Sequence, residues 1–242
     1  MAKKVRIDKY LCTCLDISRK EAKEYIRKGR ICVGGQTVKK PEEKVDQNET
    51  SVLLDGKILG YEEFHYLMLH KPQGVVSATK DNHDQTVVEL IKEPFAEKLF
   101  PVGRLDKDTE GLLLLTDDGE LAHKLLSPKK HVEKTYYAKA AGHVRKEAID
   151  QFAKGVSIGG GETALPAKLE ILSASEIESQ LLITITEGKF HQVKRMVRSI
   201  GSEVLYLKRL SMGSLVLDDT LKPGSYRRLT KDEISLLKEQ RC

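Results

Sequence analysis

The amino-acid sequence predicts an α+β protein with two unequal domains. With 242 residues, the chain is long for one compact domain and too short for three. Up to residue 31 the apolar side chains recur at helical spacing, whereas beyond residue 62 short segments with a period of two alternate with a few helical ones. This mixture favours a small module of helices and short strands, followed by a larger domain with a mixed, mainly antiparallel sheet.

The first domain is predicted to contain two short helices between residues 7 and 31. A turn at residues 16–18 separates them. Ser18 begins the second helix, because Glu21 three residues later completes a capping box. Gly29 follows two cations of the last turn and ends the helix in the way that glycine commonly does.

Short strands are predicted to follow these helices. Residues 31–33 precede the turn Gly34-Gly35, which is typical of a hairpin, and residues 51–54 form a further strand. We therefore place the first domain, a small α/β module, at residues 1–58. A charged linker leads into the second domain, which we place at residues 62–242.

The second domain is predicted to alternate strands with a few helices. Strands are expected at residues 66–70, 75–77, 111–116, 135–141, 167–172 and 181–186. Helices are expected at residues 86–91, 120–126 and 191–200. Residues 159–161 are three glycines and are expected at a hairpin tip, since their spacing does not fit a phosphate-binding loop.

Positive charge is concentrated at the N-terminus. The chain has 41 Lys or Arg and 36 Asp or Glu, which gives a net charge of +5. Residues 1–44 contain 13 Lys or Arg and 6 Asp or Glu, a net charge of +7, so the remaining residues carry a net charge of −2. The exposed side of the predicted second helix carries Arg19, Lys20, Lys23 and Arg27. A helical face of this kind positions phosphates without reading bases, and an ordinary solvated face is the alternative interpretation.

Composition also excludes several classes of protein. The four cysteines, Cys12, Cys14, Cys32 and Cys242, form no even framework and no pair of zinc ligands, so we expect reduced thiols, no bound metal and a cytoplasmic location. The basic start has no apolar segment after it, and neither secretion nor a membrane span is expected. With no tryptophan and 5% aromatic residues, the chain offers no obvious base-stacking platform.

The most distinctive segment runs from Gly103 to Gly119. It contains an acidic loop, Arg104-Leu105-Asp106, that leads into a strand with apolar residues on both faces. A loop on a rigid strand can hold a carboxylate at the rim of a sheet, where catalytic groups often lie. From the pattern alone, however, Asp106 is one of five acids between residues 104 and 119, and most such acids are solvated turn residues.

The order of residues in roughly the first 55 positions resembles the S4 RNA-binding domain. The matching residues are Arg6-Ile7-Asp8-Lys9-Tyr10-Leu11, Ser18-Arg19, Ala22, Ile26, Gly29 and Val33. The resemblance implies recognition of structured RNA. It adds Arg6 and Lys9 to the cations of the second helix as expected RNA contacts.

The segment from Gly103 to Gly119 resembles the RsuA-type family of pseudouridine synthases, whose motif is Gly-Arg-Leu-Asp-x-x-Thr-x-Gly-Leu-Leu-Leu-Leu-Thr-x-Asp-Gly. The resemblance implies that Asp106 is the essential catalytic residue. Conversion of uridine to pseudouridine replaces an N-glycosidic bond by a C-glycosidic bond without redox change, so no cofactor is expected. Asp106 could act as a nucleophile at the sugar or as a base on a ribose proton, and the sequence leaves this open.

Two further motifs resemble the same family. Lys134-Thr135-Tyr136 is similar to its Lys-x-Tyr motif, whose tyrosine stacks on the target base, and Tyr137 would then face the opposite side of the strand as a core residue. Residues 187–196 are similar to Glu-Gly-x-x-x-Gln-Val-[Lys/Arg]-Arg-Met. That similarity implies a basic side chain that keeps the catalytic aspartate ionised and oriented, and the motif register assigns this role to Lys194, with Arg195 in reserve.

The remaining candidates are expected to contact RNA or to shape the site. Arg104 is expected to bind the target phosphate or to pair with Asp106, and Gln192, Arg195 and Arg198 are expected on the substrate side. For His191 we expect an RNA contact or a hydrogen bond at the helix start rather than a metal. The segment His70-Lys71-Pro72-Gln73-Gly74 resembles the Lys-Pro-x-Gly turn of the family and is expected to be structural.

The family resemblance points to a monomeric synthase that acts on small-subunit (16S) ribosomal RNA in an assembling particle. A large-subunit synthase of the same family and a non-catalytic S4-type assembly protein are the alternatives. A glycosidase that pairs Asp106 with Asp108 or Glu110 is chemically possible, but it would leave the basic module unexplained.

Overall fold

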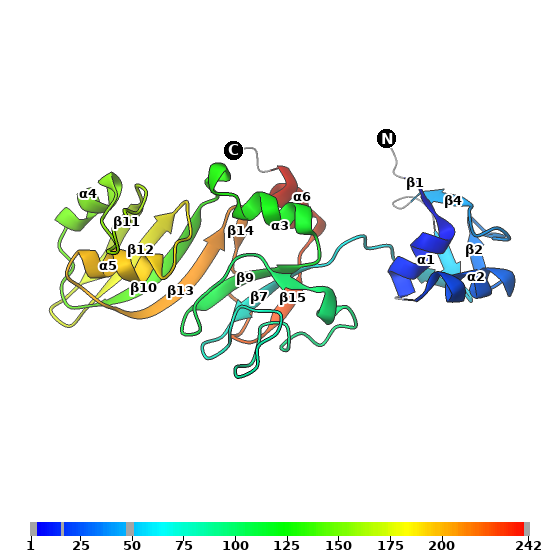
Figure 1. Ribbon diagram of the computed structural model, residues 1–242, viewed down its shortest axis with the longest axis horizontal. Coiled ribbons are helices and arrows are strands. Elements are labelled where there is room, and N and C mark those ends of the chain that lie inside the picture. The colour runs from blue at the N-terminus through cyan, green and yellow to red at the C-terminus, as the bar shows by residue number, and fades with distance from the viewer. Residues whose placement is uncertain (1–3, 16, 47–50, 240–242) are drawn as a thin grey trace. The chain divides into compact units, whose positions relative to one another are not determined.

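The computed structural model describes residues 4–15, 17–46 and 51–239 (Figure 1). The chain divides into two compact units, Met1–Phe64 and His65–Cys242. Within the described residues, none of the helices combines the length and the apolar character that crossing a bilayer requires.

The N-terminal unit packs two helices on short strands. Its elements are β1 (Lys4–Arg6), α1 (Ile7–Leu15), α2 (Arg19–Arg27), β2 (Ile31–Val33), β3 (Gln36–Thr37), β4 (Lys44–Asp46), β5 (Val52–Leu54) and β6 (Lys57–Leu59). Strands β3, β2, β5 and β6 form one antiparallel sheet in that order, and β1 pairs with β4. Ile7, Leu11, Ala22 and Ile31 are fully buried in the core between helices and sheet.

Local chemistry sets the bounds of α2. The Ser18 hydroxyl accepts a hydrogen bond from the Glu21 backbone N–H, and the Glu21 carboxylate accepts one from the Ser18 N–H at 2.8 Å. This reciprocal capping satisfies two donors that the first turn leaves unpaired. Gly29 ends the helix at φ +68°, so the predicted start and stop of α2 are both confirmed. Asp16 of the predicted turn lies outside the described residues.

A mixed sheet of nine strands organises the C-terminal unit. Its strands are β7 (Tyr66–Lys71), β8 (Phe100–Pro101), β9 (Glu110–Thr116), β10 (Lys134–Ala141), β11 (Lys168–Ala174), β12 (Glu178–Ile185), β13 (Val204–Met212), β14 (Leu215–Val216) and β15 (Tyr226–Arg228). Their order is β11-β12-β10-β13-β9-β7-β15, with β8 beside β9 and β14 beside β13. The pairing of β9 with β13 is parallel and the other strand pairs are antiparallel. The predicted fold class is therefore confirmed.

Helices cover different parts of the two faces of this sheet. The α-helices are α3 (Gly119–Leu126), α4 (Glu147–Lys154), α5 (Gln192–Ser199) and α6 (Lys231–Glu239), and two short 3-10 helices lie at Ala96–Lys98 and Pro128–Lys130. Buried residues of α4 and α5 share one core with β10 and β12, and those of α3 and α6 share a second core with β7 and β9. Strand β9 contributes Leu113 and Leu115 to the first core and Leu112 and Leu114 to the second, which explains its unbroken apolar sequence.

Two predicted elements are absent from the described structure. Residues 75–77 and 86–91 form a loop with a single bridge, Val76 to Thr86, in place of the expected strand and helix. The apolar residues of this loop, among them Val87 and Ile91, pack into the first core. Their spacing therefore reflects how an irregular segment is buried rather than a regular backbone period.

Gly111 allows β9 and β13 to lie side by side. A Cβ at this position would lie 2.2 Å from the carbonyl oxygen of Arg209, and its φ is +109°. We expect Gly111→Ala to lower the free energy of unfolding, measured by urea denaturation, by about 3 kcal/mol. The added Cβ would meet the backbone of β13, and the paired strands β9 and β13 cannot separate without losing their hydrogen bonds. Gly201→Ala is the matched control: its φ is +80° but no atom lies within 4 Å, so a loss of about 1 kcal/mol is expected. Equal losses would contradict the steric explanation.

Candidate active site

Asp106 lies in a tightly held loop before β9, with 27% of its side chain exposed. The Ser77 hydroxyl accepts a hydrogen bond from the Leu105 N–H at 3.0 Å and donates one to the Leu105 carbonyl at 2.8 Å. On the other side of Asp106, the Lys107 carbonyl accepts a bond from the Gly74 N–H at 2.8 Å. These contacts fix the backbone on both sides of the carboxylate.

Lys71, at the end of β7, binds the backbone of the same loop. Its side chain is fully buried, and its ammonium donates to the carbonyls of Pro72 (3.0 Å), Asp106 (3.0 Å) and Thr109 (2.9 Å). Burial lowers the pKa of Lys71 to about 8. The sequence analysis expected the segment that contains Lys71 to form a structural turn, and it did not predict that Lys71 binds the Asp106 loop. A turn needs Pro72 and Gly74 but no lysine, so the presence of Lys71 in the motif was the one sign of a further role.

Lys194 pairs with the Asp106 carboxylate. Its Nζ lies 3.0 Å from Asp106 Oδ2 and 2.5 Å from Asp108 Oδ1. Burial by itself lowers the pKa of Lys194, but the hydrogen bonds to Asp108 and Asp106 outweigh burial and leave that pKa raised. The structure thus brings Asp106 and Lys194 together, with Asp108 on the other side of the ammonium.

His191 also lies beside Asp106, with 3.6 Å between its Nε2 and Asp106 Oδ1. Its backbone is left-handed, at φ +49°, and its side chain makes no capping hydrogen bond to α5. The expected hydrogen bond at the helix start is therefore wrong, because side-chain capping uses an extended backbone at this position. The imidazole instead stacks on Phe190, with ring centroids 3.8 Å apart.

Tyr136 faces the helix-covered side of β10 and is 7% exposed. Its register partner on β13 is Arg209, which is 2% exposed and donates from Nε to the Leu112 carbonyl at 2.7 Å. Lys134 lies two residues before Tyr136 on the same face, and burial lowers the pKa of Lys134 to about 8. The motif Lys134-Thr135-Tyr136 had drawn attention to Lys134 but did not show that it is buried, and no sequence pattern pointed to Arg209.

Tyr137 points to the opposite side of β10, as the period of two predicts. Its expected place in the core is wrong: the side chain is only half-buried and meets the edge of Tyr206 at 6.2 Å. The physical reason is that α4 and α5 cover the other face of this strand.

The other expected RNA contacts divide into two groups. Arg104 and Arg198 are exposed, and the described contacts of Asp106 include no ion pair with Arg104. Gln192 and Arg195 are used inside the protein. Gln192 is 4% exposed and donates to the Glu187 carboxylate, whereas Arg195 donates to the Ile158 carbonyl at 2.7 Å and so fixes the neighbouring loop rather than Asp106.

These groups line a cavity of about 1410 Å³. Its charged and aromatic lining consists of Arg104, Asp106, Lys107, Asp108, Lys134, Tyr136, Glu187, Lys189, Phe190, His191, Lys194 and Arg209. Lys and Arg number six in this lining and Asp and Glu three, so the cavity favours an anionic ligand. Among the residues that the structure describes, no cluster of three or more His, Cys, Asp or Glu could hold a metal ion.

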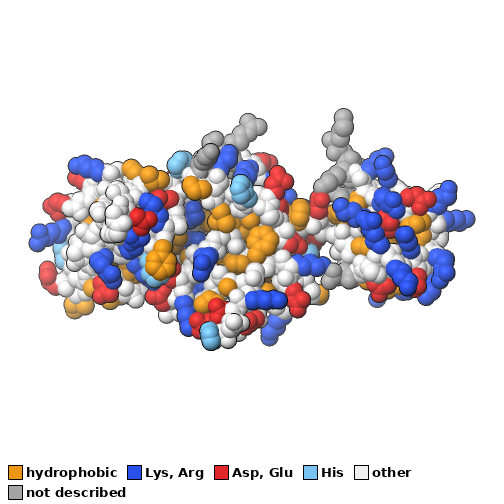
Figure 2. Space-filling model, in the orientation of Figure 1, with side chains coloured by type: hydrophobic (Ala, Val, Ile, Leu, Met, Phe, Trp, Pro, Cys, Tyr) orange, Lys and Arg blue, Asp and Glu red, His pale blue; other side chains and the backbone are white. Residues whose placement is uncertain are grey.

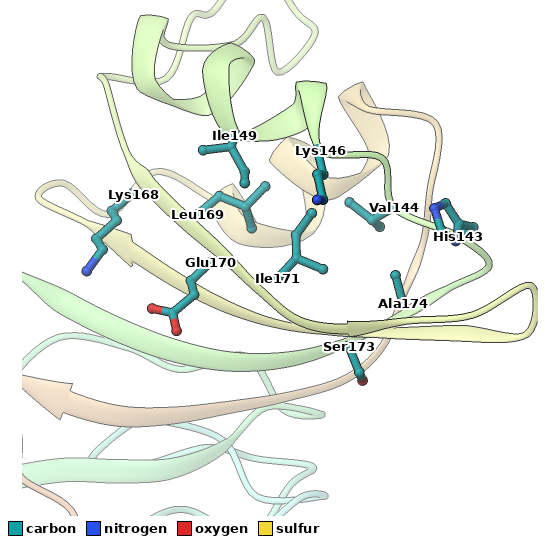
Figure 3. A pocket seen from close by; sticks show the side chains of 10 residues that line it. All are labelled: His143, Val144, Lys146, Ile149, Lys168, Leu169, Glu170, Ile171, Ser173 and Ala174. Carbon is teal, nitrogen blue, oxygen red and sulfur yellow. The ribbon is translucent and has the colours of Figure 1, made fainter.

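A second cavity, of about 450 Å³, lies between α4 and β11 (Figure 3). Leu169 and Ile171 point toward the helix, and the alternating Lys168 and Glu170 point away from it. Its interior is therefore mainly apolar and brings no pair of reactive groups together, in contrast to the cavity around Asp106.

Comparison with known proteins assigns the family. Residues 65–199 match the model of the RNA pseudouridylate synthase family, and residues 5–51 match the S4 domain. The chain belongs to the RNA pseudouridylate synthase family. Its cavity, with Asp106, Tyr136 and Lys194, lies in the synthase domain, and its N-terminal unit carries the S4 domain.

Relatives within this synthase family match almost the whole chain. An uncharacterized RNA pseudouridine synthase of Bacillus subtilis is 49% identical over 97% of this chain and 99% of its own. The ribosomal small subunit pseudouridine synthase A of Vibrio parahaemolyticus is 42% identical over 95% and 98%. A crystal structure of a pseudouridylate synthase superposes with a TM-score of 0.68 at 39% identity, covering 96% and 99%.

The S4 domain presents the cations that the sequence singled out. Arg6, Lys9, Arg19, Lys20, Lys23 and Arg27 are all exposed, and blue Lys and Arg side chains cover much of the visible surface of this unit (Figure 2). Arg6 is partly neutralised, because it pairs with the buried Asp8 at 2.8 Å. The helix α2 is therefore the larger source of positive field on this domain.

The Lys194 ion pair leads to a prediction on pH dependence. In Asp108→Asn the ammonium keeps Asp106 but loses one of the two carboxylates that raise its pKa against burial. The pKa of Lys194 should then fall, and the alkaline limb of the kcat/KM profile should move to lower pH than in the wild type. A profile measured between about pH 7 and pH 10.5 tests this, since the ordinary lysine pKa is about 10.4. Superimposable profiles would show that Asp108 does not act through Lys194.

Proposed function

We propose that this protein isomerises a specific uridine of small-subunit (16S) ribosomal RNA to pseudouridine. The observation that best supports this proposal is the Asp106–Lys194 ion pair. It lines a cavity rich in cations together with Tyr136, in a chain that belongs to this synthase family. The small-subunit assignment is supported by relatives named ribosomal small subunit pseudouridine synthase A, which match nearly the full chain. We further propose that the protein acts as a cytoplasmic monomer on an assembling small-subunit particle.

The proposed chemistry needs one positioned carboxylate. Asp106 would attack the ribose or accept a ribose proton while the N-glycosidic bond breaks, and Tyr136 would stack on the released base so that it can rotate. Lys194 would hold the Asp106 carboxylate in its orientation, and Lys71 would hold the backbone beneath it. Arg104, exposed at the cavity, would meet the RNA backbone.

A glycosidase mechanism fits the site less well. It requires a carboxylic acid that stays protonated beside a carboxylate. Asp108 is a poor general acid, because its hydrogen bond and ion pair with Lys194 outweigh burial and lower its pKa.

Replacing Asp106 tests the activity directly. In cells whose only copy is Asp106→Asn, pseudouridine should disappear at one position of small-subunit rRNA and nowhere else when all ribosomal RNA is mapped. Purified Asp106→Asn should release tritium from 5-tritiated small-subunit RNA at least about a thousandfold more slowly, because the amide is neither a nucleophile nor a base. An unchanged small-subunit map with a lost large-subunit site would redirect the assignment, and no change in any RNA would refute it.

The S4 domain should supply affinity rather than chemistry. Reversing charge in Arg19→Glu/Lys23→Glu should weaken binding of small-subunit RNA about tenfold or more at low salt and flatten the dependence of log Kd on log salt. Binding is measured by filter retention over a salt series, and the unfolding midpoint of the synthase domain checks that it remains folded. Glu24→Gln, on the same helix, is the control and should not weaken binding. Unchanged affinity in the double variant would contradict the proposed RNA-binding face.

A further inference from the structure

Phe190 is an exposed aromatic ring at the active-site cavity. It lines the cavity together with Asp106, yet 76% of it is exposed to solvent. The His191 ring covers it in a stacked arrangement, with centroids 3.8 Å apart and planes 18° apart. His191 in turn approaches Asp106 to 3.6 Å, so the aromatic pair begins beside the carboxylate.

The turn that displays Phe190 is held by hydrogen bonds rather than left loose. Gln192 accepts a bond from the Lys189 N–H at 2.9 Å and donates one to the Glu187 carboxylate at 2.9 Å. Arg195 donates to the Phe190 carbonyl at 3.2 Å while it also binds the Ile158 carbonyl. An aromatic ring fixed in advance loses little conformational entropy when a ligand stacks on it.

The surroundings of Phe190 suit a nucleobase. Six Lys or Arg against three acids line the shared cavity, which favours a polyanion over an apolar peptide. Stacking on an aromatic ring is open to every base, because each has a π-face. Tyr136, the ring expected to meet the target uridine, lies on β10 and is 7% exposed, so Phe190 offers a second and far more open ring.

We propose that Phe190, backed by His191, is the stacking platform for the nucleobase next to the target uridine. This inference rests on the proposed function for its substrate, and it adds a contact outside the reacting nucleotide. The flanking base would extend the Phe190–His191 pair to three rings. Such a contact holds the RNA strand at the mouth of the cavity while the uridine enters.

Binding of a fluorescent RNA tests the platform without turnover. The probe is a short single-stranded RNA with one uridine and 2-aminopurine directly before or after it, whose emission falls when the analogue stacks. We expect quenching by the wild-type protein and by Phe190→Tyr, and a loss of quenching with an about tenfold higher Kd in Phe190→Ala. Ile177→Ala is the matched control, since Ile177 is 85% exposed on the same domain, and it should behave as wild type.

Substrate changes separate stacking from a general loss of structure. Removing the flanking base from the RNA should weaken binding to the wild-type protein about tenfold, yet change little in Phe190→Ala, because the two changes delete the same contact. In turnover of small-subunit RNA, Phe190→Ala should raise KM with little effect on kcat. The proposal would be overturned if removal of the flanking base weakened RNA binding equally in the wild type and in Phe190→Ala, or if Phe190→Ala still quenched the 2-aminopurine emission. Absence of turnover by the wild-type protein would instead contradict the proposed function. The measurement of stacking on Phe190 would remain valid, because it does not depend on turnover.

Discussion

The position of Asp106 depends on the hydrogen bonds that the buried ammonium of Lys71 donates to the backbone of the Asp106 loop. Lys71 binds the backbone carbonyls of Asp106 and Thr109 from the end of β7, and no part of its side chain is exposed. A buried cation costs free energy unless its donors are satisfied, and here the carbonyls of Pro72, Asp106 and Thr109 satisfy them. The loop and the lysine therefore stabilise each other, which fixes the Asp106 backbone before any RNA binds.

A second constraint acts on the Asp106 side chain from helix α5. Lys194, in the first turn of α5, reaches Asp106 and Asp108 at once, so one ammonium sets the orientation of the acidic loop. The parallel pairing of β9 with β13 places Arg209 next to Gly111, and the antiparallel pairing of β10 with β13 places it beside Tyr136. The site thus combines a rigid backbone, one oriented carboxylate and a buried aromatic ring in a cavity whose lining holds more cations than acids.

Local features were predictable because their causes lie within a few residues. The start of α2 follows from Ser18 and Glu21, and β9 follows from an unbroken apolar run. The loop at residues 75–91 was not predictable in this way, since its apolar residues are buried by contacts with distant strands. For the same reason the pattern could not show that Gln192 is turned inward by Glu187.

The sequence by itself determined the fold class, the synthase family and the segments that contain Asp106, Tyr136 and Lys194, because motifs and periodicity are local. The tertiary structure decided which groups meet. It joined Lys71 to the backbone of the Asp106 loop, placed Lys194 within reach of two carboxylates, and stacked Phe190 on His191 in the lining of the cavity. These contacts join residues that are up to 88 positions apart, as with Asp106 and Lys194, and no local pattern specifies such a separation.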